Sequence, residues 1–323
     1  MAQPRIALVG AGSMGRNHAR VIAQSDEAIL DVVVDPFEES GRALADAHGT
    51  RWVPDLSGAG NIDAVVVAAS TEHHYGIARQ AIDAGLPLLV EKPVCPSLEL
   101  TLEVLDASQR AGTPIMCGLL ERYNPAFVIA KKMIEGPLYV RADRHSPYAP
   151  RIKTGVAWDL LVHDVDLIVQ LFGAAEPTSI NVEAGRFHPL SVPGAEDVVD
   201  VSLGFPGGGI ASASASRLGQ RKVRTLLVQT LNAMVEIDLL RRGVTLYRHT
   251  TIAEDQLGGS GYRQVTEMEV PEVTGKEPLV TQLERFVALV DGRVDADEER
   301  LSILPAHRIV DRALAAGATP HTS

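Results

Sequence analysis

A lysine and an acid–histidine pair are the residues of this sequence whose types and spacing suggest proton chemistry. Lys92 stands in Glu91-Lys92-Pro93, directly after the apolar run 86–90. Partial desolvation at the end of a buried strand would lower the pKa of the ammonium and suit it to proton transfer with a hydroxyl. Pro93 disfavours helical dihedrals at Lys92 and keeps it extended. The alternative is a solvent-exposed Glu–Lys pair at a surface turn.

The acid–histidine pair lies in TGVAWDLLVHDVDL, residues 154–167. Asp159 and His163 are spaced i and i+4, which places them on one face of a predicted helix. That face can carry a base and a group that orients it. Asp164 and Asp166 point elsewhere; with His163 they suggest a metal site, but no further ligand cluster accompanies them, and we expect no metal. Taken alone, His163 resembles an ordinary helix-surface histidine. Only its occurrence in the same chain as Lys92 and a dinucleotide-binding turn favours a catalytic role.

A glycine-rich stretch, GAGSMG at residues 10–15, predicts dinucleotide binding because it follows a strand and opens a helix. Gly10 permits a tight turn, Gly12 lets backbone amides approach a pyrophosphate, and Gly15 lets helix pack on strand. Ser13 and Met14 complete the motif, at a helix N-terminus whose partial positive charge would face the phosphates. The alternative is a glycine-rich turn that binds no ligand.

Asp35 ends the next predicted strand, 25 residues after Gly10. Its carboxylate would accept hydrogen bonds from the adenosine ribose hydroxyls and repel a 2′-phosphate, which favours NAD over NADP as the cofactor. Asp35 could instead cap the helix that follows, and the two roles can coexist.

The elements that must position these residues follow a regular order in the first third of the chain. Apolar strands alternate with helices, which predicts a parallel sheet covered on both faces; the strands are 5–10, 29–35, 62–70, 86–90 and 114–118. Beyond Gly118 we predict an amphipathic helix, 158–172, then strands 197–205 and 210–216 with period-two patterning, and a last helix from Leu304. The predicted domains are 1–119, 120–302, and a C-terminal helix and tail, 303–323.

Bulk composition is that of an ordinary globular protein. The chain has 323 residues, 46% hydrophobic and 22% charged, with a formal net charge of −11. Its basic residues are scattered, so we expect no nucleic-acid partner, and no apolar stretch is long enough to predict a membrane span. The N-terminus runs straight into a strand rather than a signal peptide. Cys95 and Cys117 lack metal-ligand spacing and suggest a reduced compartment, so the expected location is cytoplasmic.

In combination, GAGSMG, Glu91-Lys92-Pro93, the Asp-x-x-x-His of 159–163 and STEHH at 70–74 resemble the glucose–fructose oxidoreductase/inositol dehydrogenase (Gfo/Idh/MocA) family. The resemblance implies an α/β fold: an N-terminal Rossmann domain and a C-terminal α/β domain with a large open, mostly antiparallel sheet. It implies that Lys92 and His163 handle protons and that Asp159 supports them. It also implies cofactor contacts for five residues: Ser70, Thr71, His74, Glu91 and Lys92.

Within this family, ERYNPAF at 121–127 and the 154–167 segment are similar to UDP-N-acetylglucosamine 3-dehydrogenases. That similarity implies a substrate side lined by Arg122, Tyr123, Asn124 and Trp158, with Arg144 and Arg151 as candidates for a diphosphate. The alternative for these arginines is solvated loop charge.

The function implied is NAD-dependent oxidation of a secondary hydroxyl on a sugar, a nucleotide sugar such as a UDP-N-acetylhexosamine (at its 3-OH), or a cyclitol. His163 would take the hydroxyl proton and Lys92 would stabilise the charge developing on that oxygen. One alternative is a non-catalytic NAD- or sugar-sensing regulator, which could have lost Lys92, Asp159 or His163. Another is a biliverdin-reductase-like reductase, which would not need His163. The small-residue strand 210–216 predicts a homodimer or homotetramer formed through the C-terminal sheet.

Overall fold

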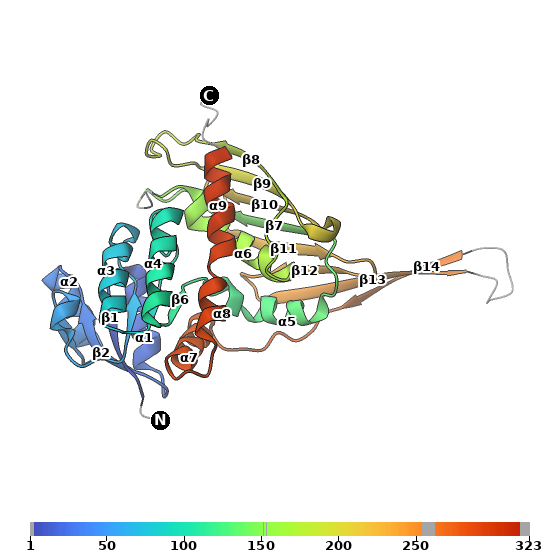
Figure 1. Cartoon of the computed structure of the whole chain (residues 1–323). Helices are drawn as coiled ribbons and strands as arrows, with labels where there is room; N and C mark the ends of the chain where they lie inside the picture. Colours follow the sequence, from blue (N-terminus) through green and yellow to red (C-terminus); the bar gives the residue numbers. More distant parts are fainter. Residues whose placement is uncertain (1–2, 151, 153, 254–261, 317–323) are drawn as a thin grey trace. The chain divides into compact units, whose positions relative to one another are not determined.

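The computed structural model describes residues 3–150, 152, 154–253 and 262–316 (Figure 1). Contacts divide the chain into two compact units: Met1–Tyr123 with Lys276–His307, and Asn124–Gly275 with Arg308–Ser323. This division differs from the predicted one, which assigned 120–302 to the second domain. The segment Lys276–His307 packs with the first unit instead, because its helices bury their apolar faces there.

The first unit is built on a six-stranded sheet of order β3-β2-β1-β4-β5-β6, and every neighbouring pair is parallel. This confirms the parallel sheet expected from the alternation of elements. The short strand β3 was not predicted, because three partly exposed residues carry no periodicity. The strands are β1 (Arg5–Val9), β2 (Ile29–Val34), β3 (Arg51–Val53), β4 (Ala64–Val67), β5 (Leu88–Val90) and β6 (Ile115–Cys117).

Helices connect these strands, each running from the end of one strand toward the start of the next. The connections include α1 (Ser13–Ala23), α2 (Glu38–Ala47), the 3₁₀ turn η1 (Leu56–Ala59), α3 (Thr71–Asp83) and α4 (Leu98–Ala111), and the 3₁₀ turn η2 (Leu120–Tyr123) follows β6. The local chemistry explains the bounds of α4. Ser97 accepts a hydrogen bond from the Leu100 amide at its start, and Gly112 ends it in the left-handed conformation.

Two later helices, α7 (Pro278–Val290) and α8 (Ala296–Leu301), complete the first unit. Leu279, Leu283 and Phe286 recur at helical spacing on α7, and they share one buried cluster with Ile6 and Leu8 of β1. The apolar stripe of α7 therefore finds its partner in the first unit. The last helix, α9 (Leu304–Ala316), matches the predicted C-terminal helix and contributes residues to both units.

The second unit is built on an eight-stranded sheet of order β14-β13-β12-β11-β7-β10-β9-β8. Its neighbours are antiparallel except β7 and β10, which are parallel. The predicted strands 197–205 and 210–216 correspond to β9 and β10. The strands are β7 (Tyr139–His145), β8 (Ser179–Gly185), β9 (Val198–Gly204), β10 (Ile210–Ser216), β11 (Val223–Gln229), β12 (Met234–Asp238), β13 (Gly243–Ala253) and β14 (Tyr262–Glu269), with the short turn η4 (Pro206–Gly208) between β9 and β10.

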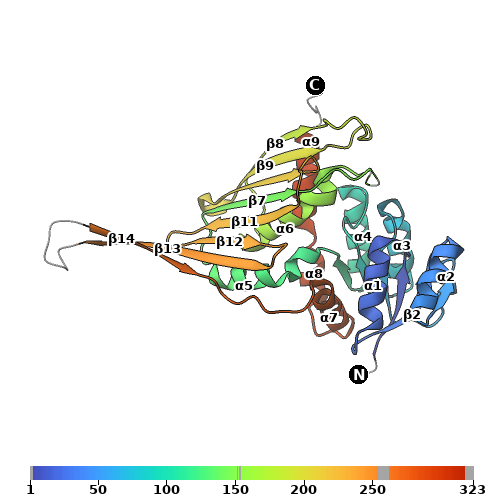
Figure 2. The same cartoon turned by 180° about the vertical axis from the view of Figure 1, so that it is seen from behind.

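Helices α5 (Pro125–Met133) and α6 (Val162–Leu171) lie on one face of this large sheet (Figures 1 and 2). Ala211, Ala213 and Ala215 of β10 are buried, whereas Ser212 and Ser214 alternate with them on the opposite face. That opposite face is hollowed by about 720 Å³ and is lined by both polar and apolar residues of β7, β8, β9 and β10. The small-residue alternation thus serves a sheet packed on one side only.

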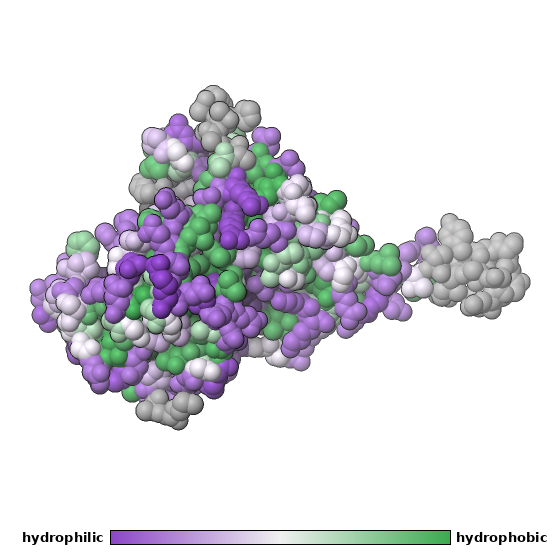
Figure 3. All heavy atoms as spheres, in the orientation of Figure 1, coloured by the Kyte–Doolittle hydropathy of each residue, from purple (hydrophilic) through white to green (hydrophobic). Residues whose placement is uncertain are grey.

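No helix among the residues that the structure describes is long and apolar enough to cross a membrane. Hydrophilic side chains are interspersed with hydrophobic ones over the face of the molecule visible in Figure 3.

Candidate active site

The glycine-rich turn joins β1 to α1, and two of its glycines are required by close approach. Gly10 has φ +105°, and a Cβ there would lie 2.7 Å from the carbonyl carbon of Ala68. A Cβ on Gly15 would lie 1.9 Å from the Gly10 carbonyl oxygen. Both glycines therefore serve the packing of the turn against β4 and of α1 against the turn.

Gly12 differs from these two because a Cβ there would meet nothing within 4 Å. It is the N-cap of α1, which has no side-chain cap and no acidic residue in its first turn. The backbone amides of Ser13 and Met14 lie at the positive end of the dipole of α1 and are thus available to bind an external anion. These features fit a dinucleotide pyrophosphate.

Asp35, at the end of β2, is buried and accepts backbone hydrogen bonds from both sides. Its Oδ2 lies 2.7 Å from the Ala11 amide nitrogen, and its Oδ1 lies 2.9 Å from that of Phe37. It therefore fixes the glycine-rich turn and the chain before α2, but the capping alternative is wrong, because the N-cap of α2 is Phe37 and no side chain caps the helix. Asp35 makes no ion pair with any described residue, so its negative charge is not neutralised by a neighbouring cation.

A pocket of about 810 Å³ lies at the carboxyl ends of β1, β2 and β4. In a doubly wound sheet this edge is where ligands bind. Gly12 and Asp35 lie in its wall, as does Ser70, one of the predicted cofactor contacts. Phe37, which is 75% exposed, adds a large apolar surface beside Asp35 that the sequence analysis did not single out. Such a pocket, which combines apolar side chains with a few polar and acidic ones, suits an adenosine.

The Glu91–Lys92 turn follows β5 and is not an exposed surface pair. Glu91 is buried, and its Oε1 lies 2.8 Å from Nε2 of His18 on α1. A Cβ on Gly118 would lie 2.8 Å from the other carboxylate oxygen of Glu91, so the end of β6 packs closely against it. Lys92 itself is partly exposed, and its peptide bond to Pro93 is cis. The carboxylate is thus part of the support beneath Lys92.

Two further histidines hold the chain just beyond Lys92. The ring nitrogens of His74, a predicted cofactor contact, lie 2.9 Å from the Pro93 carbonyl oxygen and 3.0 Å from that of Ala69. His74 is 1% exposed, so it points into the protein, behind Thr71 at the start of α3. His307 of α9 accepts a hydrogen bond from the Val94 amide over 3.2 Å. Burial lowers the pKa of His307 to about 4, which keeps the ring neutral and able to accept.

In the second unit, Asp159 and His163 lie where a π-helical turn, η3 (Ala157–Leu161), leads into α6. The sequence pattern predicted an uninterrupted amphipathic helix from 158, and the first turn of that prediction is wrong because residues Ala157–Leu161 form a π turn. Residues four and five apart share a face in a π turn, so this geometry is compatible with Asp159 and His163 on one face, and their pairing stays a prediction. Both side chains are partly exposed. Trp158, a predicted substrate contact, is partly exposed on the same turn.

Arg144, predicted as a diphosphate ligand, is a core residue of the second unit. It is 2% exposed, and its guanidinium makes two hydrogen bonds of 2.8 Å to the two oxygens of Asp164. The pair ties β7 to α6. Arg144 has no surface to offer a diphosphate unless it leaves Asp164 as an uncompensated buried charge, which is costly.

Two of the remaining predicted substrate residues, Arg122 and Asn124, make hydrogen bonds within the protein. Arg122 donates to the hydroxyl and carbonyl oxygens of Ser302, and Tyr123 is partly exposed at the end of η2. Asn124 is 4% exposed and caps α5, because its Oδ1 accepts from the Ala126 amide. Arg151 lies outside the described residues.

Among the described residues, no three His, Cys, Asp or Glu side chains are grouped so that they could hold a metal ion. Both cysteines are buried, and burial raises the pKa of the Cys95 thiol to about 12, so Cys95 is not a thiolate near neutral pH. His18 and His307, which contact the residues on either side of Lys92, were not predicted from the sequence. Only His18, on the helix that follows the glycine motif, had a recognisable position.

Family models match both parts of the chain. Residues 4–119 match the oxidoreductase family with an NAD-binding Rossmann fold, and residues 129–233 match the GFO/IDH/MocA C-terminal domain.

Known proteins are similar along most of the chain. The UDP-N-acetylglucosamine 3-dehydrogenase of Acidithiobacillus ferrooxidans is 26% identical over 290 residues, which cover 89% of this chain and 88% of that protein. The scyllo-inositol 2-dehydrogenase (NAD(+)) of Bacillus subtilis is 30% identical, over 67% of this chain and 68% of that protein.

A crystal structure of the Acidithiobacillus ferrooxidans UDP-N-acetylglucosamine 3-dehydrogenase superposes with a TM-score of 0.86 at 22% identity, covering 98% of this chain and 99% of that one. It shares the fold of both units. The family matches agree with the parallel sheet, the glycine-rich turn and the pocket beside Asp35. This chain therefore belongs to the Gfo/Idh/MocA family of oxidoreductases.

Proposed function

We propose that this protein is an NAD-dependent dehydrogenase that oxidises a secondary hydroxyl of a nucleotide sugar or a cyclitol. The observation that carries the proposal is the pocket at the carboxyl edge of the parallel sheet, with the open Gly12 and the buried Asp35 in its wall. Family membership supports the reaction class. The similarity to UDP-N-acetylglucosamine 3-dehydrogenase makes a UDP-N-acetylhexosamine, oxidised at its 3-OH, the first substrate to test.

The choice of NAD over NADP rests on the charges near the ribose position. Asp35 carries an un-neutralised carboxylate, and Glu38 and Glu39 add negative charge in the first turn of α2. The nearby Arg42 is engaged by Glu38, 2.6 Å from its Nε, and lies over the Trp52 ring. A 2′-phosphate would therefore meet carboxylates and no available guanidinium from α2.

In this proposal Lys92, Asp159 and His163 act on one substrate hydroxyl. His163 accepts the hydroxyl proton, Asp159 stabilises the imidazolium that forms, and Lys92 donates a hydrogen bond to the oxygen as negative charge develops there. When bound, the nicotinamide supplies the acceptor for the hydride that leaves the same carbon. The buried Glu91–His18 pair and the His74 and His307 contacts support Lys92 by holding the chain on both sides of it.

A substrate screen with a binding control tests the proposal. The full chain would be incubated with NAD and, in turn, UDP-N-acetylglucosamine, UDP-N-acetylgalactosamine, myo-inositol, scyllo-inositol and glucose, and reduced nicotinamide would be followed by absorbance. We expect turnover of one of the two UDP-sugars or one of the two inositols, and we expect His163→Ala to abolish that turnover. NAD binding by calorimetry without turnover of any of these compounds would contradict the dehydrogenase and favour a sensor. Turnover unaffected by His163→Ala would favour a reductase that does not use this residue.

The assembly proposed is a homodimer or homotetramer formed through the large sheet. Support comes from the face opposite α5 and α6, where Ser212 and Ser214 give β10 small side chains beside those of β7 and β9. A two-fold axis would bring such a face against its own copy. Light scattering at micromolar concentration should give a multiple of the chain mass, and a monomer mass would contradict the proposal. Ser212→Arg should then reduce the mass, whereas Lys132→Glu on α5 should not.

A further inference from the structure

Two buried charged residues hold the start of the helix that carries Asp159 and His163. Glu196 precedes β9 and is 8% exposed; Arg217 follows β10 and is 4% exposed. Both belong to the second unit, as the helix does. Buried charges are kept in proteins where they are paired or bind a specific group, so this cluster calls for a role.

Glu196 caps the π turn η3. Its Oε1 lies 2.7 Å from the Ala157 amide nitrogen, and its main-chain oxygen lies 3.1 Å from the Val156 amide nitrogen. Gly155 makes this approach possible, because a Cβ there would lie 2.1 Å from Oε2 of Glu196. Glu196 thus binds two amides at the start of the turn, one through its carboxylate and one through its carbonyl oxygen, and sets the direction in which the turn begins.

Arg217 connects the same turn to the acidic side chains around it. Its guanidinium donates to the Thr154 carbonyl oxygen and lies 4.0 Å from Oδ2 of Asp159. Its backbone amide donates to the Asp197 carbonyl oxygen over 2.9 Å. Burial raises the pKa of Glu196, and the charge of Arg217 is among the effects that oppose this rise. The charge of one buried cation therefore acts on the carboxylates of Asp159, Glu196 and Asp197.

We infer that Arg217 is a positioning residue for the reaction: it holds Asp159 as an oriented carboxylate, so that Asp159 can support His163 as the base. The inference rests on the proposed function for its catalytic meaning. The groups facing Arg217 are Asp159 on η3 and Glu196 and Asp197 ahead of β9, with His163 on the next turn of the same helix. Removing the cation takes away the positive charge that acts on these three carboxylates, so protons bind more readily to the Asp159–His163 pair.

The test compares Arg217→Met with Arg217→Lys in the full chain. The titration of His163 is followed by NMR on protein with labelled histidine, without substrate, and is assigned with His163→Ala. We expect His163 to titrate at higher pH in Arg217→Met and near the wild-type pH in Arg217→Lys, because lysine restores the charge. On the substrate identified by the screen, Arg217→Met should lower kcat by about tenfold or more and move the acidic limb of kcat/KM to higher pH. The KM for NAD should not change.

Glu196→Gln provides a second variant of opposite sign. The amide oxygen can still accept from the Ala157 amide, but the negative charge is gone, so His163 should titrate at lower pH than in the wild type. Unmoved His163 titration in both Arg217→Met and Glu196→Gln would overturn the inference. Equal impairment in Arg217→Lys and Arg217→Met at every pH would also overturn it, since that pattern belongs to a packing role. If no substrate is turned over, the proposed function fails while the titrations still decide this inference.

Discussion

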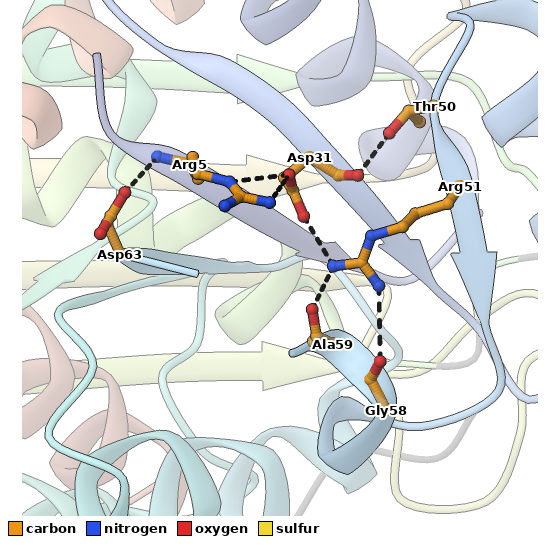
Figure 4. A network of polar contacts seen from close by, with 7 residues as sticks. All are labelled: Arg5, Asp31, Thr50, Arg51, Gly58, Ala59 and Asp63. Carbon is orange, nitrogen blue, oxygen red and sulfur yellow. Dashed lines mark hydrogen bonds and ion pairs between the residues drawn. The ribbon is translucent and has the colours of Figure 1, made fainter. Parts of the chain in front are cut away.

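Two aspartates, one within β2 and one just past its end, differ in the groups that bind their carboxylates. Asp31, near the start of β2, accepts hydrogen bonds from Arg5 over 2.7 and 2.9 Å and from Arg51 over 2.6 Å (Figure 4). Asp35, just past its end, accepts only from polar groups without charge, chiefly the backbone amides of Ala11 and Phe37.

The partners decide what each carboxylate can do. Burial would raise the pKa of Asp31, but the hydrogen bonds and charges of Arg51 and Arg5 outweigh it and hold the pKa below its ordinary value. Its charge is neutralised by the two arginines of the network at the amino edge. This network also includes the Ala59 and Gly58 carbonyls, which accept from Arg51 (Figure 4). Asp35 keeps its charge available in a pocket wall. An acid bound by amides can serve a ligand, whereas an acid bound by two guanidinium groups serves the fold.

The largest expected difference between the two edges is in turnover. Lys92→Met at the carboxyl edge removes the ammonium but keeps most of the packing of the stem, so kcat should fall on the order of 10²-fold. Arg51→Met at the amino edge is the matched loss of a cation and should leave kcat unchanged. Stopped-flow single turnover on both variants checks this. Unchanged hydride transfer in Lys92→Met would remove the lysine from the mechanism.

Alanine substitutions at two glycines, each of which has room for a Cβ within the protein, should differ in their effect on NAD affinity. Gly12→Ala meets no protein atom within 4 Å, so stability should hold, but the methyl group occupies the space of the pyrophosphate. We expect NAD to bind about tenfold more weakly, or about 1.4 kcal/mol. Gly58→Ala, which makes ordinary contact with Val53 at 3.4 Å, is the amino-edge control and should bind NAD normally. Calorimetry measures both, and wild-type affinity in Gly12→Ala would place the phosphates elsewhere.

Cofactor selectivity should depend on Asp35 and not on Asp31. Asp35→Asn removes the charge and keeps an oxygen for one backbone amide. The ratio of the dissociation constant for NADP to that for NAD should therefore fall several-fold, by about tenfold at most. Asp31→Asn should leave the ratio as it is. Titrating each variant with both cofactors gives the comparison. A wild-type enzyme that binds NADP as tightly as NAD would show that the carboxylate does not face the 2′ position.

Acid stability should depend on Asp31. Because its folded-state pKa is lowered, Asp31 contributes stability that is present above its unfolded pKa and is lost as the pH falls through the folded pKa. Asp31→Asn should therefore lower the free energy of unfolding by up to about 1 kcal/mol at neutral pH, since its arginine partners are partly exposed. The difference from wild type should shrink as the pH falls below about 4. Urea unfolding at two pH values measures it, and a constant difference would contradict the network's ionic origin.

Much of the first unit follows from short stretches of sequence. The apolar runs gave the parallel strands, the glycines gave the turn, and Asp35 followed at the end of the second strand. These features are local: strand burial, turn geometry and helix start are set by residues next to one another in the chain. The Asp159–His163 spacing was readable for the same reason, although the π turn before it was not, because no residue pattern distinguishes i→i+5 from i→i+4 bonding there.

Tertiary structure alone decided which polar and charged residues are brought together and which are committed to the fold. His18 meets Glu91, His307 meets Val94, and Arg217 meets Asp159 across long separations in sequence. Arg144, as eligible for a diphosphate by type as any arginine, is committed to Asp164 in the core. Such pairs have no local signature, because they exist only when strands and helices from distant segments pack and exclude water. The sequence by itself determined the fold class, the cofactor turn and the candidate proton-transfer residues; packing determined which charges remain available to a ligand.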